Sequence, residues 1–248
     1  MAVRRASLGH DETWPVIERE RLHLADLLDT LTADEWASGS LCAGWRVGDV
    51  AAHVALAARP PGPRELLVNG LRARGSFHRL NHDLAVRHAS TRSSATLVTE
   101  LREHAASRRL PVGTNHRNIL LDVLVHTQDI AIPLHRSHRM PADAARASAT
   151  RVWTMGWPFW ARRRLAGFRL HATDVEWTAG TGPHEISGPI DALLLLLTGR
   201  AAGLPHLTGP GIATLTTHLA ARLATPPGRG NPITPPARRT SPGPTPPP

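Results

Sequence analysis

The first two thirds of the chain repeat apolar residues at the three- and four-residue spacing of an α-helix, and this pattern restricts the possible folds most. The first stretch runs from Val16 to Leu31, with Glu18, Glu20 and Asp26 available to water. Its apolar positions are Val16, Leu22, Leu24, Leu27, Leu28 and Leu31. Prolines and glycines interrupt the pattern farther along, so we expect several packed helices. The further segments predicted to be helical are Val47–Ala58, Pro63–Arg87 with a break near Gly75, one that begins after Ser94, Asn118–Ile132 and Pro141–Trp157.

The pattern changes after Ala166, where apolar and polar residues alternate as they do in half-buried strands. The predicted strands are Phe168–Thr173, Val175–Trp177 and His184–Ile186, and Pro189–Leu197 follows as a helix with proline in its first turn. The sequence therefore predicts a mainly α protein, a helical bundle followed by a small α+β domain. We expect a bundle domain at 1–162 and an α+β domain at 163–222.

The last part of the chain, 223–248, is predicted to be a disordered, proline-rich tail. Its stretch from Pro226 to Pro248 holds ten of the 22 prolines, together with Gly, Ser, Thr and Arg. Such a composition offers too little apolar surface to offset the entropy of ordering. We expect no catalytic residue in it.

Composition argues against a nucleic-acid or membrane protein. The formal net charge is +9, but all 29 basic residues are arginine and they are scattered, so the charge reflects the residue bias of a GC-rich genome more than a basic binding face. No apolar run approaches the roughly 18 residues that span a bilayer. The first residues lack the apolar run of a secretory signal, and Cys42 is the single cysteine. We expect a cytoplasmic protein.

The chemistry-bearing pattern is a carboxylate and a histidine on one helical face. Asp122 and His126 are four residues apart, and Asp129 continues the same stripe on an otherwise apolar helix. His53 lies among core positions of another predicted helix and is expected to point inward. Two histidines and one carboxylate with an open position suit a catalytic zinc ion or another divalent first-row metal. The alternative is that these side chains only hydrogen-bond within the core.

Other histidines offer weaker candidates. His78 and His82 are also four apart, but their polar neighbours suggest a solvent-exposed face. His135 and His138 are predicted to lie in a loop. Spacing alone leaves all of these possibilities open.

A resemblance to a known family reduces the number of candidate metal ligands. The segment Cys42-Ala-Gly-Trp-Arg-Val-Gly-Asp-Val-Ala-Ala-His53 resembles a CxGWxVxDVxxH stretch of the mycothiol-dependent maleylpyruvate isomerase family, a branch of the metal-binding DinB-like superfamily. The segment from Asp122 to Ile130 is similar to the family's second signature, a carboxylate four residues before an HxxDI element. Thr173–Trp177, Gly188–Leu193 and Gly199-Arg200 match its smaller domain. The similarity extends from about Glu18 to Leu219.

The resemblance implies a DinB-like up-down four-helix bundle in which His53, Asp122 and His126 hold one divalent metal ion, with zinc expected. It also implies mycothiol as a cosubstrate. The isomerases carry Glu where this chain has Asp122, whose shorter side chain must reach the metal through a shifted backbone or a water. Asp129 is expected to orient a ligand, and Arg200 resembles an active-site arginine that would suit a substrate carboxylate. Cys42 is expected to be a small buried residue. Trp45 and Asn81 also match positions of the family, but packing and helix contacts explain these two residues equally well.

These residues predict a metal-dependent isomerase or S-transferase in which a low-molecular-weight thiol attacks a small electrophile. The rival prediction is a binding protein that keeps the scaffold and the metal without this chemistry, because one fold hosts many functions. A basic module that binds nucleic acid would need a cationic face that the sequence does not display.

Overall fold

Several helices begin where a polar side chain caps the first turn. The computed structural model describes residues 8–74 and 76–224. The first helix begins at His10, before the predicted Val16, because the Glu12 carboxylate accepts a hydrogen bond of 2.7 Å from the Gly9 N–H. Ser76, Ser93 and Asn115 cap three later helices with their side-chain oxygens. The first part of the chain contains α1 (His10–Asp29), α2 (Ala33–Ala37), α3 (Val47–Ala58), α4 (Pro63–Arg72), α5 (Phe77–Ser90), α6 (Ser94–Glu103), α7 (His116–Ala131) and α8 (Ala142–Thr154).

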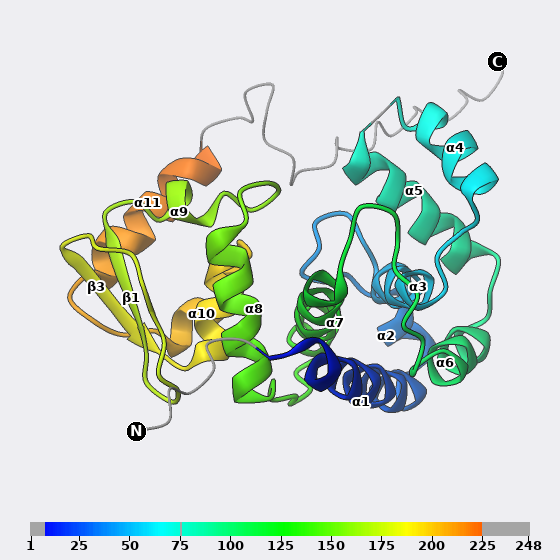
Figure 1. Ribbon diagram of the computed structural model, residues 1–248, viewed down its shortest axis with the longest axis horizontal. Helices are drawn as coiled ribbons and strands as arrows, with labels where there is room; N and C mark the ends of the chain where they lie inside the picture. Colours follow the sequence, from blue (N-terminus) through cyan, green and yellow to red (C-terminus); the bar gives the residue numbers. More distant parts are fainter. Residues whose placement is uncertain (1–7, 75, 225–248) are drawn as a thin grey trace, which may run out of the picture.

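The bundle is formed by α1, α3, α6 and α7, which bury a shared apolar core (Figure 1). Leu24, Val50, Leu101 and Ile130 contribute one side chain from each helix. Helix α5 packs on α3, and α4 packs on α5. The helical bundle predicted from periodicity is confirmed.

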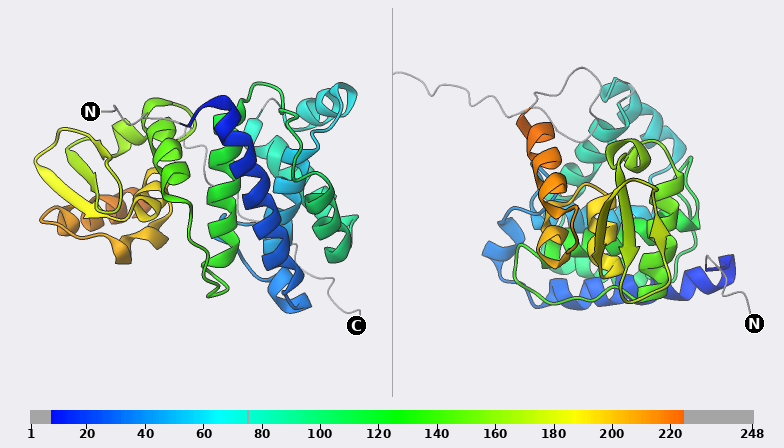
Figure 2. Two further views of the ribbon diagram at one scale, coloured as in Figure 1. Left: turned by 60° about the horizontal axis from the view of Figure 1, so that its bottom comes forward. Right: turned by 90° about the vertical axis from the view of Figure 1, so that its left-hand side faces the viewer.

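The second part is a three-stranded sheet with helices, as predicted. Its strands are β1 (Phe168–Ala172), β2 (Thr178–Ala179) and β3 (His184–Gly188), and β1 lies in the centre, antiparallel to β2 and parallel to β3. The helices of this part are α9 (Ala161–Arg164), α10 (Ile190–Leu197), the 3-10 helix η1 (Ala201–His206) and α11 (Ile212–Ala224). Figure 2 shows α10 behind the sheet.

The prediction of a strand at Val175–Trp177 was wrong. The Ala172 N–H donates to the Trp177 carbonyl at 3.0 Å, so the residues between them form a bend before β2. Asp174 within this bend accepts a hydrogen bond of 2.9 Å from the Ile190 N–H at the start of α10. The alternating residues that suggested a strand therefore form a turn, and its Asp174 caps the start of α10.

Helix α8 lies between the two parts and packs against both α7 and α10. A second apolar core includes side chains from α1, α7, α8, the sheet and α10. Helix α8 thus contacts both the bundle and the α+β part, and the domain limits of 1–162 and 163–222 stay a prediction. Helix α11 ends at Ala224, two residues into the predicted tail. The rest of that tail lies outside the described residues.

None of the helices in the described residues is both long and apolar enough to cross a membrane.

A buried ion pair joins the bundle to the α+β part. Asp129 of α7 has no exposed surface, and Arg200 follows α10. The Arg200 guanidinium donates through Nε to Asp129 Oδ1 at 3.0 Å and through Nη2 to Asp129 Oδ2 at 2.7 Å. Such a two-point contact fixes both groups in one geometry.

We expect Asp129→Ala to lower the free energy of unfolding by about 3–5 kcal/mol, because it leaves the charge of Arg200, whose side chain is only 15% exposed, without its partner. The matched control is Asp143→Ala, since Asp143 pairs with Arg146 at 3.2 Å but its side chain is 65% exposed. That change should cost about 0–1 kcal/mol. Urea denaturation of both variants measures the difference, and equal costs would contradict the prediction.

Candidate metal centre

Two neighbouring helices present the predicted ligands to one another. Asp122 and His126 are one turn apart on α7, and His53 lies on α3, which packs against α7. Val50 and Val54 on α3 are buried, so this side of the helix faces the bundle interior, as expected for His53. All three predicted ligands therefore come from helices, which hold side chains more rigidly than loops do.

The three side chains converge. His53 Nε2 lies 3.3 Å from Asp122 Oδ1, and His126 Nε2 lies 3.5 Å from the same oxygen. The imidazole centroids are 4.9 Å apart, and one donor atom from each of the three residues lies within 4.8 Å of the others. The side chains keep 16–27% of their surface exposed. The cluster is thus partly open to solvent.

This donor set fits a divalent metal ion. Ligand atoms bound tetrahedrally to zinc at 2.0–2.1 Å are about 3.3 Å apart, close to the two measured separations. Imidazole nitrogen and carboxylate oxygen are donors that zinc and other first-row metals accept. The shorter Asp122 side chain reaches both histidines without an intervening group.

The charges of the cluster are strongly coupled. Burial alone would raise the pKa of Asp122, but the imidazoles of His53 and His126 outweigh it and hold that pKa well below its ordinary value. Burial alone would lower the pKa of His126, but the Asp122 carboxylate and its other neighbours raise it well above the usual range. Burial lowers the pKa of Arg21 to about 10, and the Asp122 charge opposes that change. The cluster is therefore a place where charge is concentrated inside the protein.

A second layer of side chains orients His126. Its Nδ1 lies 2.9 Å from Asp129 Oδ2, which leaves Nε2 facing Asp122. Asp129 in turn is held by Arg200, whose Nη1 also donates to the Thr198 carbonyl at 2.9 Å. All three nitrogens of the Arg200 guanidinium thus have acceptors within the protein.

Sequence reasoning missed the position of Cys42. Its Sγ donates to Asp129 Oδ2 at 3.1 Å and lies 3.7 Å from His126 Nδ1. The backbone helps, because the Leu41 N–H donates to the Asp129 carbonyl at 3.0 Å and holds this loop against α7. The only available signal was the place of Cys42 in the motif before α3, which says nothing of its distance from α7.

Trp45 forms a wall of the cluster. Its ring meets the His53 ring edge-on at 5.6 Å and the His82 ring at 5.7 Å. The side chain of His82 is 33% exposed and lies 3.2 Å from Asp83. His78 instead contacts Trp157 and has its pKa lowered by burial. These two histidines are thus more enclosed than the predicted solvent-exposed face, and they form no metal-type cluster among residues 8–74 and 76–224.

Comparisons with known proteins agree with this geometry. Residues 17–131 match the family model described as the mycothiol maleylpyruvate isomerase N-terminal domain. That segment contains His53, Asp122, His126 and Asp129, and Arg200 lies beyond it. Curated protein sequences include no match to the chain.

Two solved structures share the fold. The mycothiol-dependent maleylpyruvate isomerase is 16% identical, with a TM-score of 0.57 over 82% of this chain and 93% of that one. A histidine-to-alanine mutant of the mycothiol-dependent maleylpyruvate isomerase is 15% identical, with a TM-score of 0.56 and the same coverage. At these identities the likeness establishes a common fold. Residues 17–131 are thus similar to the N-terminal domain of the mycothiol maleylpyruvate isomerase family, and the chain shares the overall fold of the solved isomerase.

Proposed function

We propose that this protein is a metal-dependent enzyme that uses mycothiol, or a similar low-molecular-weight thiol, to attack a small electrophile. The convergence of His53, Asp122 and His126 supports it most directly. A divalent metal held by these three residues, with zinc expected, would supply the positive charge that keeps a thiol ionised near neutral pH. Thiol addition to a conjugated cis double bond, rotation and elimination would make an isomerase. Retention of the adduct would make an S-transferase.

The residues around the proposed ligands would position them. Asp129 holds the Nδ1 side of His126, so that Nε2 stays directed at the metal position. Arg200 holds Asp129, and we assign it a positioning role, because a substrate carboxylate would have to compete with Asp129 for the guanidinium. Trp45 contacts the His53 ring edge-on and would limit the access of water from that side. No protein nucleophile is needed, since the thiol comes from the cosubstrate.

A metal-binding protein without turnover is the second candidate. The observation that favours it is Asp122, where the isomerases carry Glu. Both candidates need the metal, so metal content does not separate them. We expect the cytoplasm as the location of either.

Turnover separates the two. We expect purified protein loaded with zinc to convert mycothiol and at least one member of a panel of small electrophiles, maleylpyruvate included, to an adduct or an isomer. His53→Ala should lower the rate by more than about 100-fold, because it removes a ligand, while the exposed His171→Ala should leave the rate unchanged. Mass spectrometry and absorbance follow the products. Full metal occupancy without any turnover would favour the binding protein.

Metal content tests the ligands themselves. We expect His53→Ala and His126→Ala, alone and together, to remove one divalent ion per chain relative to the parent. Each single variant leaves two donors and the double variant leaves one, and such sets bind a metal weakly. Elemental analysis of protein purified without a histidine tag measures this. An unchanged metal content in the double variant would rule out this site.

Asp122 is tested by changing charge and length separately. Asp122→Asn keeps the size but removes the charge that helps to hold a cation, so we expect weaker zinc binding. Asp122→Glu restores the reach that the isomerases have and should keep the metal. If Asp122 only hydrogen-bonds to its neighbours, Asn should be tolerated and Glu should overpack the interior, at a cost of roughly 1–3 kcal/mol. Zinc affinity and thermal unfolding of both variants distinguish the two cases.

A further inference from the structure

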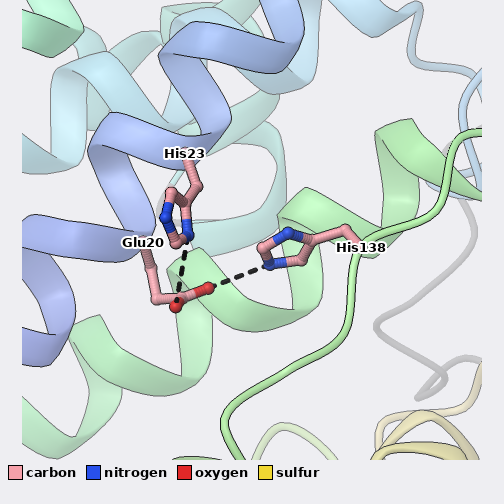
Figure 3. Close-up of side chains that lie close together, drawn as sticks. All are labelled: Glu20, His23 and His138. Carbon is pink, nitrogen blue, oxygen red and sulfur yellow. Dashed lines mark hydrogen bonds and ion pairs between the residues drawn. The ribbon is translucent and has the colours of Figure 1, made fainter.

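A second cluster of metal-type donors lies where α1 meets the loop between α7 and α8. Glu20 and His23 are about one turn apart on this helix, and His138 comes from the loop between α7 and α8 (Figure 3). The Glu20 side chain is 1% exposed, and its two oxygens point to different imidazoles. Oε2 lies 2.9 Å from His138 Nε2, and Oε1 lies 3.8 Å from His23 Nδ1. The cluster shares no residue with the centre of His53, Asp122 and His126.

We propose that Glu20, His23 and His138 form a second binding site for a divalent transition metal of the zinc type. One donor atom from each residue lies within 4.8 Å of the other two. The separations of 2.9 and 3.8 Å lie on either side of the about 3.3 Å expected between tetrahedral zinc ligands. His23 is 49% exposed, so its ring has room to turn and close the remaining distance.

The burial of Glu20 supports a bound cation. A carboxylate removed from water needs a compensating charge or several hydrogen bonds. Among the described residues, the ion-pair partners of Glu20 are His23 and His138. An imidazole carries a positive charge only when it is protonated, whereas a divalent cation supplies the charge in either case. Two neutral imidazoles and one carboxylate are then all used as ligands.

The surroundings hold one ligand in place and leave room for water. Gln128 of α7 is buried and donates through Nε2 to the His138 carbonyl at 2.8 Å, which fixes the loop beside α1. Glu20 and His23 also line an open depression of about 470 Å³, which they share with Asp174 and Asp191 of the α+β part and with Arg139. Water from this depression can complete the coordination, and the opening provides a path for the ion.

The position of the site indicates its role. A metal ion there would join α1 to the loop that leads from α7 into α8, next to the border with the α+β part. An ion that binds only the folded chain stabilises it by mass action. This site would therefore secure the connection between the two parts, whether or not the first centre is catalytic.

The test counts zinc ions bound by the full chain after treatment with a chelator. Zinc is added back in competition with a chromophoric chelator, and thermal unfolding is recorded at each step. We expect two sites in the parent chain. His23→Ala should weaken one of them by more than about tenfold, since removal of a ligand exceeds the loss of a supporting contact. His53→Ala should abolish the other, and the double variant should bind no zinc tightly.

His23→Ala is informative because this side chain is half-exposed, and its removal leaves the contact between Glu20 and His138 intact. We expect its melting temperature without metal to match that of the parent, and its rise on zinc addition to be smaller. The matched control is His10→Ala, another exposed histidine on α1, which should keep both sites. The proposal is wrong if the single variants His23→Ala and His138→Ala each bind as many zinc ions as the parent, with unchanged affinity. The cluster would then only form hydrogen bonds between α1 and the loop.

Discussion

The ion pair between Asp129 and Arg200 is the contact on which the arrangement of this protein depends. The carboxylate is fully buried, and its two oxygens receive the guanidinium of Arg200, the imidazole of His126 and the thiol of Cys42. Three distant segments therefore meet at one side chain: helix α7, the loop before α3 and the segment after α10. A buried carboxylate is stable only when such partners surround it, so the α+β part is needed to complete the surroundings of His126.

The two clusters proposed as metal sites, around Asp122 and around Glu20, are built from the same kinds of side chain. The clusters of Asp122 and of Glu20 each combine two imidazoles with one carboxylate, and in both a helix supplies the carboxylate with one histidine three or four residues away. The cluster of Asp122 closes between two packed helices of the bundle. The cluster of Glu20 closes between a helix and a loop that Gln128 holds. The first is thus set by helix packing, and the second by the course of the chain between α7 and α8.

Several structural features could be predicted because they depend on neighbouring residues in the chain. Helix α3 has the predicted limits, Val47–Ala58. The helical spacing of its valines and alanines starts at Val47, and the prolines that follow Arg59 cannot continue a helix. Helix α1 begins earlier than predicted because Glu12 caps it, although Pro15 lies inside it. The short helix α2 lacks an apolar stripe and was missed. His138 lies in a loop, as predicted, but its neighbours in the sequence gave no sign of its contact with Glu20.

The sequence by itself determined the helical first part, the change to an α+β part and the spacing of Asp122 and His126, because these follow from periodicity within one segment. The apolar residues around His53 suggested that it points inward toward that pair, and the motif resemblance supported this assignment. Only the tertiary structure decided that Cys42 and Arg200 meet at Asp129, and that His138 returns to Glu20. Those contacts join residues separated by 71 to 118 positions. Local pattern carries no information about such distances, since they are set by how the helices pack and by where the loops between them run.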